Sequence, residues 1–198
     1  MSRSETMKES PTYSVRYRRK RVGKTDYKTR MKLLKGGQKR LVVRRSLKNI
    51  WLQIVEFHPT GDKVLVTAHS HEIRKLGWKG ALNNLPAAYL CGLLLGKKAK
   101  AKKITAAMLD IGLSVSVKGA VLYAALKGVV DAGINVPHAK EVLPDEKRIR
   151  GEHIAAWAKK MKEQPEKYNK MFTRYIKAGL SPENLPAHLE EIKKKVLA

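Results

Sequence analysis

The stretch RLVVRRSLKNIWLQIVEFHPTGDKVLVTAHS, residues 40–70, decides the fold because it contains three strand patterns in succession. These patterns lie at residues 40–46, 49–57 and 63–70. The first is rich in β-branched residues, the second alternates in hydrophobicity, and the third follows the turn HPTGD. Their short connections predict an antiparallel meander. In the second strand Ile50, Leu52 and Ile54 share one face, and Trp51, Val55 and Phe57 lie mostly on the other.

After this stretch the pattern changes to helix, strand and helix. In LNNLPAAYLCGLLLG (82–96) the leucines have helical spacing, Asn83 or Asn84 can cap the helix, and Pro86 is tolerated in its first turn. The segment ITAAMLDIGL (104–113) predicts a buried strand. The segment KGAVLYAALKGVVDAG (118–133) predicts a helix with Gly133 as its C-cap. A meander followed by these elements predicts an α/β sandwich with a mixed sheet covered by helices.

Both ends of the chain differ from this centre. Residues 1–12 are polar and aperiodic, and we expect them to be disordered alone. A short helix is predicted with Thr25 as its N-cap and Asp26 in its first turn, ending at Gly36-Gly37. Three further helices are predicted at 151–162, 165–178 and about 185–197. The sequence therefore predicts a basic N-terminal arm with a short helix (1–37), an α/β core domain (38–138) and a C-terminal helical extension (139–198).

The chain is strongly and unevenly basic. Its 198 residues contain 42 Lys and Arg against 17 Asp and Glu, a net charge of +25. The net charge is +14 in residues 1–50, +1 in 51–96, +5 in 97–103, 0 in 104–139 and +5 in 140–198. Such a field requires a polyanion, either nucleic acid or an anionic membrane surface. Its apolar runs fall far short of the ~20 residues of a membrane span, and it lacks a secretory signal, so a soluble cytoplasmic protein without a membrane partner is expected.

Two catalytic motifs are suggested only weakly. Gly23-Lys24-Thr25 resembles the end of a phosphate loop, but that motif needs a glycine where Arg18 stands and a preceding strand. The carboxylates Glu56, Asp110 and Asp131 are too scattered for the acidic cluster of a two-metal nuclease. We therefore interpret Asp110 as a structural hydrogen-bond acceptor. No catalytic residue is predicted.

Metal and thiol chemistry receive no stronger support. His58, His69, His71 and Cys91 lack the paired short spacings of a zinc site. The single cysteine, Cys91, lies within an apolar helix face and is interpreted as a small buried hydrophobe. The sequence indicates no metal and no cofactor.

The basic arm points instead to RNA. Ten cations lie between Arg16 and Lys35 against one acid, so intrahelical ion pairs cannot relieve their repulsion. Arginine suits bidentate phosphate contacts, and Tyr13, Tyr17 and Tyr27 can stack on unpaired bases. A nuclear-localisation peptide explains only RRKR, whereas the cations continue beyond it; KKAKAKK (97–103) is a second phosphate patch or a solvated helix end. The predicted RNA-binding residues are Arg16, Tyr17, Arg18, Arg19, Lys20, Arg21, Lys24, Thr25, Tyr27, Lys28, Arg30, Lys32, Lys35, Arg44, Arg45, Lys48, Lys97, Lys98 and Lys100.

Several motifs together resemble a known family. These are RRKRVGKTDYKTRMKLL, AHSHEIRKLGWKGALNN, AAYLCGLLLGKKA, GAVLYAALKGVVDAGINVPH and EKYNKMFTRYIKAGL. In this order they resemble large-subunit ribosomal protein eighteen in its archaeal/eukaryotic form, from about residue 14 through the C-terminal helices.

The resemblance implies a three-layer α/β sandwich with a mixed sheet and a ribonuclease-H-like motif, without nuclease activity. It also implies a structural constituent of the large ribosomal subunit that binds 5S rRNA in the central protuberance, with the arm from Arg16 to Lys32 on that RNA. Large-subunit rRNA and neighbouring ribosomal proteins are the other partners it implies. Two alternatives remain at this point: a metal-dependent RNA-processing nuclease of the same fold, and a general DNA-compacting protein.

Overall fold

A computed structural model describes residues 14–197 of the chain, so the expectation for residues 1–12 lies outside the described residues. Its four-stranded sheet has the order β3-β2-β1-β4. The strands are β1 (Arg40–Arg45), β2 (Ile50–Glu56), β3 (Lys63–His69) and β4 (Met108–Asp110). β1, β2 and β3 pair antiparallel and β4 pairs parallel with β1, which confirms the predicted meander and mixed sheet. The strand predicted at 104–113 is shorter, with only three residues in the sheet.

The meander buries one face of the sheet. Ile50, Leu52 and Ile54 are at most 1% exposed, as their alternation predicts, whereas Trp51 on the opposite face is 52% exposed. Val55 is only 4% exposed, but it lies on the outer face as expected, because it lines the same surface groove as Trp51 and Gln53 and is absent from the core under the sheet. The pairing register of β2 with β3 shifts between Ile54 and Val55.

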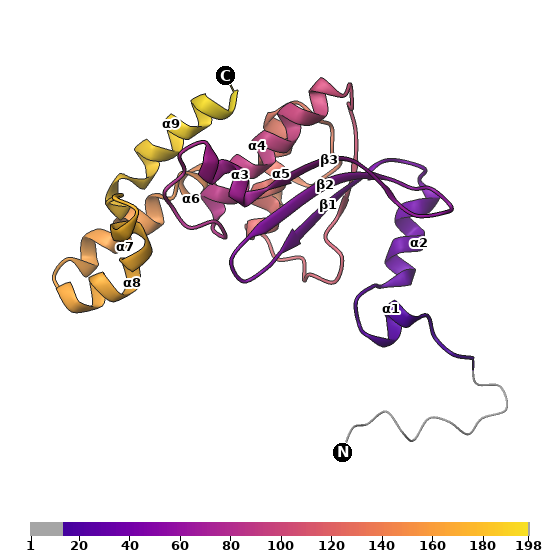
Figure 1. The fold of residues 1–198 in the computed structure, drawn as a ribbon, viewed down its shortest axis with the longest axis horizontal. Helices are drawn as coiled ribbons and strands as arrows, with labels where there is room; N and C mark the ends of the chain where they lie inside the picture. Colours follow the sequence, from indigo (N-terminus) through magenta and orange to yellow (C-terminus); the bar gives the residue numbers. More distant parts are fainter. Residues whose placement is uncertain (1–13, 198) are drawn as a thin grey trace, which may run out of the picture.

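Two helices, α4 (Leu85–Ala101) and α5 (Val121–Asp131), cover the buried face of the sheet (Figure 1). Asn84 is the N-cap of α4, and its side-chain oxygen accepts a 3.0 Å hydrogen bond from the backbone N–H of Ala87. The helix continues past its predicted end at residue 96 because lysine and alanine are good helix formers. The C-cap of α5 is Ala132 rather than Gly133, which follows it with a left-handed φ of +93°.

α4 and α5 approach each other at glycines. A Cβ atom on Gly92 would lie 2.2 Å from the carbonyl oxygen of Ala125, and one on Gly128 would lie 2.2 Å from that of Tyr89. The two backbones are therefore in contact, which only glycine permits. This close pair forms the middle layer of the molecule.

The C-terminal helices form a further layer against α4. The predicted helices are confirmed as α7 (Glu152–Met161), α8 (Pro165–Lys177) and α9 (Leu185–Leu197), preceded by a short α6 (Glu146–Arg150). Leu185, Leu189 and Ile192 of α9 join Leu90 and Leu93 of α4 in a second hydrophobic cluster. The arrangement is consistent with the predicted three-layer α/β sandwich, and Figure 1 shows α7, α8 and α9 at the end of the molecule away from the N-terminal helices.

The arm contains two helices, α1 (Arg18–Arg21) and α2 (Tyr27–Lys35), and corrects two predictions. The RRKR run forms a helical turn of its own, whereas a single short helix was predicted in the arm. Asp26, not Thr25, is the N-cap of α2, because its carboxylate accepts hydrogen bonds from the backbone N–H groups of Lys28 and Thr29. Aspartate is among the best N-caps, and the hydrogen bond that its carboxylate accepts from the Thr29 hydroxyl, together with these two backbone bonds, lowers its pKa.

Besides α1 and α6, one more α-helix of the described residues was not predicted. α3 (Ser70–Lys75) directly follows β3 and is capped by His69, whose ring nitrogen accepts from the backbone N–H of His71 at 3.2 Å. Glu72 completes a capping box by accepting from the N–H of His69 at 3.0 Å. Histidine is an unusual cap, so the segment was interpreted as the end of a strand.

Within residues 14–197 no helix combines the length and the hydropathy needed to cross a bilayer.

Candidate nucleic-acid interface

The arm presents an exposed set of cations. Figure 1 shows α1 and α2 projecting from the end of the sheet where β1 begins. Within residues 14–197, nine of the predicted RNA-binding cations here are exposed and form no ion pair with a carboxylate. They are Arg16, Arg18, Arg19, Lys20, Arg21, Lys24, Lys28, Lys32 and Lys35. Because no carboxylate of the described residues pairs with these cations, an external anion is needed to relieve the repulsion among them.

Local contacts fix the path of the arm between its two helices. The Nε–H of Arg19 donates a 2.8 Å hydrogen bond to the hydroxyl oxygen of Thr25, across a turn in which Gly23 has a φ of +62°. The rings of Tyr17 and Tyr27 pack together with centroids 4.9 Å apart. Thr25 therefore closes the turn between α1 and α2 instead of capping α2. Tyr13, expected to join these tyrosines, lies outside the described residues.

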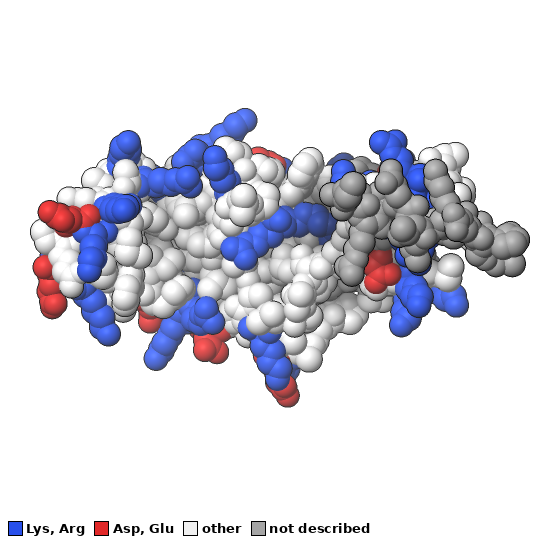
Figure 2. All heavy atoms as spheres, turned by 90° about the horizontal axis from the view of Figure 1, so that it is seen from below, with Lys and Arg blue, Asp and Glu red and all other residues white. Residues whose placement is uncertain are grey.

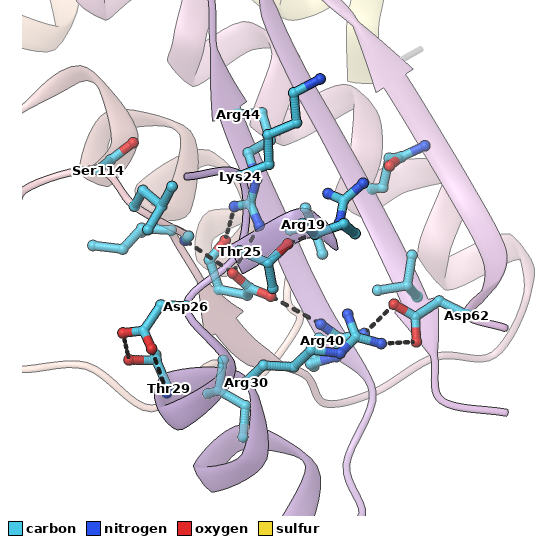
Figure 3. Close-up of a pocket in the computed structure, with 18 of the residues that line it drawn as sticks. Arg19, Lys24, Thr25, Asp26, Thr29, Arg30, Arg40, Arg44, Asp62 and Ser114 are labelled. Atoms are coloured by element: carbon cyan, nitrogen blue, oxygen red, sulfur yellow. Dashed lines mark hydrogen bonds and ion pairs between the residues drawn. The ribbon is translucent and has the colours of Figure 1, made fainter. Parts of the chain in front are cut away.

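The outer face of the sheet carries a network of arginines and aspartates. Leu41 and Val43 point into the core, so Arg40, Val42 and Arg44 share the outer face. The parallel register pairs Val42 with Asp110, which places this carboxylate between the two arginines. Arg40 Nη1 is 2.9 Å from Asp110 Oδ2, and Arg44 Nη2 is 2.9 Å from Asp110 Oδ1 (Figure 3).

A second aspartate extends this network to the arm. Asp62 accepts from Arg40 Nη2 at 2.6 Å and from Arg30 Nη2 of α2 at 2.9 Å (Figure 3). Arg30 and Arg44, both predicted to bind RNA, are thus neutralised within the protein. The network fixes α2 against the sheet and leaves the remaining arm cations available.

Asp110 is the most strongly held carboxylate of the network. Burial raises its pKa, but the hydrogen bond and charge of Arg44, the backbone N–H of Gly112 and the charge of Arg40 together bring the pKa below its ordinary value. Asp110 is 6% exposed and Arg40 is 2% exposed. Asp110 is therefore an ionised structural acceptor, as predicted.

A groove of about 650 Å³ separates the arm from the outer face of the sheet. Arg19 and Lys24 line its arm side, while Trp51, Gln53 and Ser114 line its sheet side. The Trp51 ring is half exposed, and its Nε1–H donates a 3.0 Å hydrogen bond to Thr67 Oγ1, which fixes the ring on the strand surface. A groove with the cations of Arg19 and Lys24 on one wall and a fixed indole on the other can take phosphates and a stacked base together.

The remaining predicted residues lie outside this groove. Arg45 Nε donates to Asn83 Oδ1 at 2.7 Å, and Lys48 is exposed in the turn between β1 and β2. Lys97 and Lys100 are exposed near the end of α4, whereas Lys98 forms an ion pair with Glu72 and donates to the carbonyl of Thr67. The KKAKAKK cluster is therefore separate from the arm, and one of its lysines already has a carboxylate partner.

Three residues of the groove were missed by the sequence reasoning: Arg40, Trp51 and Asp62. The alternation of charged and apolar residues in RLVVRR was a usable signal, since positions 40, 42 and 44 must share a face. Trp51 was assigned to the outer face without a role. Asp62 carried no signal, because its partners are 22 and 32 residues away.

The three carboxylates that were considered as possible nuclease residues each form an ion pair with a basic side chain. Glu56 is 3.7 Å from Lys39 Nζ and Asp131 is 2.8 Å from Lys127 Nζ, while Asp110 is held by arginines. In the described part of the chain no three His, Cys, Asp or Glu residues are grouped as a metal ion would require. Cys91 is fully buried, and burial raises its thiol pKa to about 12, which confirms its interpretation as a buried hydrophobe.

On the part of the surface that Figure 2 leaves uncovered, basic side chains are spread from one end to the other, with fewer acidic side chains among them. The model of a family described as ribosomal large subunit proteins 60S L5 and 50S L18 matches residues 11–105 and 97–139 of the chain. The chain belongs to this family. The match contains the described arm, the whole sheet, α4 and α5, and it confirms the resemblance to the archaeal/eukaryotic type.

As a large-subunit ribosomal protein, the chain has a structural rather than an enzymatic role. This role agrees with the contacts of Asp110, whose two carboxylate oxygens pair with Arg40 and Arg44. It also accounts for the charge, because a ribosomal protein is surrounded by RNA phosphates.

Proposed function

We propose that this ribosomal protein binds 5S rRNA through its arm and the adjoining groove, and helps to anchor that RNA in the central protuberance of the large subunit. The observation that carries the proposal is the set of nine exposed arm cations without carboxylate partners in residues 14–197, beside a groove in which aspartates neutralise Arg30, Arg40 and Arg44. The resemblance of the arm sequence RRKRVGKTDYKTRMKLL to the 5S-binding family member supports the same RNA.

Binding follows from the two kinds of groups in the interface. The arm cations neutralise phosphates and release condensed counterions, which supplies affinity and makes it strongly salt-dependent. Trp51 offers a flat apolar surface on which an unstacked base of an irregular RNA can lie. Selectivity comes from the fit of a particular RNA shape between the arm and the sheet rather than from the phosphate contacts.

The proposal assigns a task to each region of the chain. Residues 1–37 bind RNA, residues 38–138 form the rigid domain that positions the arm, and residues 139–198 form an extension toward other parts of the subunit. Large-subunit rRNA and neighbouring ribosomal proteins complete the surroundings, and the assembled particle is cytoplasmic.

A competition experiment tests the proposal. The full chain is titrated with labelled 5S rRNA and with an unrelated structured RNA of equal length, at 150 mM salt and over a salt series. We expect at least a tenfold preference for 5S rRNA. The variant Arg18→Ala/Arg19→Ala/Arg21→Ala reduces the slope of log K against log salt by about 2 to 3, because each lost phosphate contact removes nearly one.

The matched control is Lys147→Ala/Lys159→Ala/Lys160→Ala, which removes the same charge from exposed positions of α6 and α7. It should leave the preference for 5S rRNA unchanged. Equal affinity of the wild type for both RNAs contradicts the proposal. A large fall in the melting temperature of the arm variant would show instead that the arm belongs to the folded core.

A further inference from the structure

A second basic groove lies at the other end of the sheet. It has a volume of about 450 Å³ and is formed by the β1–β2 turn, α3, the loop after α3, and α8. Its cations are Lys48, Arg74, Lys79, Arg174 and Lys177, and only Lys48 was predicted to bind RNA. The sequence offered no signal for this cluster because its members are spread over 130 positions and the fold brings them together.

The cations of this groove are not neutralised by the protein. Its lining contains no aspartate or glutamate, and in residues 14–197 none of the five cations forms an ion pair with a carboxylate. All five are exposed. This distinguishes it from the groove beside the arm, where Asp62 and Asp110 occupy three arginines.

Rigid contacts hold the walls of the groove in place. The Nδ2–H of Asn84 donates to the hydroxyl of the buried Tyr175 at 3.3 Å, which fixes α8 and therefore Arg174 and Lys177. The backbone N–H of Lys79 donates to His188 Nε2 at 3.2 Å. The His188 ring stacks on the buried Trp78 with centroids 5.2 Å apart. The cations are thus displayed from an ordered base rather than from a loose tail.

The lining favours a phosphate backbone over a protein surface. Protein interfaces depend on buried aromatic and large apolar anchors, whereas Leu82 is the one large apolar side chain here and it is 8% exposed. Five uncompensated cations in one groove match the closely spaced charges of a nucleic-acid strand. Arg74 and Arg174 come from different helices and can fork onto phosphates from two sides.

We propose that this groove is a second RNA-binding site, which holds the phosphate backbone of a stretch of RNA independently of the arm. β1 runs from the arm end of the sheet to the turn that carries Lys48, and its six residues span about 20 Å. Figure 1 shows α3 and α8 on the side of the sheet away from α1 and α2. The protein therefore clamps two stretches of RNA at its two ends.

The direct test uses a large-subunit rRNA transcript that contains no 5S sequence as the probe. The groove variant is Arg74→Gln/Lys79→Gln/Arg174→Gln/Lys177→Gln. The control variant Lys140→Gln/Lys147→Gln/Lys159→Gln/Lys160→Gln removes the same charge from exposed positions outside the groove. We expect the groove variant to bind the transcript at least tenfold more weakly at 150 mM salt, with a salt slope reduced by about 2 to 3, and the control to change less than threefold.

A second measurement uses the wild-type chain and avoids any question of folding. Acetylation of lysines is mapped with and without the transcript. Lys79 and Lys177 should be protected, while Lys159 and Lys160 remain reactive. Equal behaviour of the groove and control variants, or equal acetylation of all four lysines, would overturn the proposal.

The remaining outcomes are also decisive. If the groove variant loses 5S rRNA binding to the same extent as the arm variant, the site is not independent of the arm and the proposal fails. If RNA binding is unchanged but the variant fails to retain a ribosomal protein in large subunits, the groove binds an acidic protein instead. Because the transcript contains no 5S sequence, a failure of 5S selectivity leaves this test valid.

Discussion

Replacing Asp110 with asparagine should destabilise the fold, because it leaves a buried guanidinium without the more deeply buried of its two counter-charges. Arg40 is 2% exposed, and Asp110 Oδ2 is 2.9 Å from its Nη1. The Nε–H of Arg40 is buried and has no hydrogen-bond partner in the described residues, so no spare contact compensates. Removing one member of a buried ion pair typically costs about 3–5 kcal/mol.

The expected magnitude lies at the lower end of this range. Asp62 still faces Arg40 Nη2 at 2.6 Å, and Arg44, which also loses Asp110, is partly exposed and can turn to water. We therefore expect the free energy of unfolding at pH 7 to fall by about 3 kcal/mol. For a chain of 198 residues this corresponds to a decrease in melting temperature of about 6–12 °C. Urea titration followed by far-ultraviolet circular dichroism measures it, with an unchanged m value.

The pH dependence gives an independent check. The pKa of Asp110 is lower in the folded protein than in the unfolded chain, so its contribution to stability is fully present above the unfolded pKa of about 3.9. The contribution is lost as the pH falls through the lower, folded pKa. The difference in stability between wild type and Asp110→Asn should therefore stay constant from pH 7 to about pH 5 and shrink below about pH 4.

Two further variants decide whether the mechanism is correct. Asp62→Asn should cost only about 1 kcal/mol, because Asp62 is more exposed than Asp110. Adding Arg40→Met to Asp110→Asn should recover stability, since it removes the uncompensated buried charge. A loss below about 1 kcal/mol for Asp110→Asn, or no recovery in the double variant, would refute this reasoning.

Four other outcomes follow from the structure. Gly92→Ala should lower the free energy of unfolding by about 3 kcal/mol in urea titrations, because its Cβ would lie 2.2 Å from a carbonyl oxygen of α5. Cys91 should not react with a thiol reagent at pH 8 in the native state but should react in denaturant, given its burial and a pKa of about 12. Trp51→Ala should weaken 5S rRNA binding about tenfold at unchanged melting temperature, through loss of base stacking. Asp26→Ala should reduce the protection of α2 amides from hydrogen exchange, whereas Thr25→Ala should preserve it.

The elements that the sequence predicted are those specified by local periodicity. The alternation in β2 and the leucine spacing of α4 each depend only on residues close together in the sequence. Both elements are therefore found in the structure as predicted. The errors arose where two local choices compete. Thr25 and Asp26 are both good caps, and the choice depends on which residue begins the helical turn. The helical turn of RRKR has no apolar face, so periodicity gave no sign of it.

The site was predicted in part for a different reason. Exposed arm cations such as Arg18 and Lys28 were found from charge density alone, because nothing else in their neighbourhood neutralises them. Arg40 was missed and Arg44 was taken for an RNA ligand because their partner Asp110 is 70 and 66 residues away. Ion pairing between residues so far apart in the sequence is set by the strand register, which composition alone does not predict.

The few acidic residues of this protein therefore decide which of its cations are available to RNA. Asp62 and Asp110 lie at one groove and hold Arg30, Arg40 and Arg44 as part of the fold, whereas the groove between α3 and α8 has no acid in its lining. Repulsion among the cations of that second groove is tolerated because Tyr175 and His188 fix its walls through contacts to the core. Because its walls are rigid, the groove needs little rearrangement to bind phosphates. Its unpaired cations supply the attraction. The same number of cations on a flexible tail would lose more conformational entropy on binding and gain less affinity.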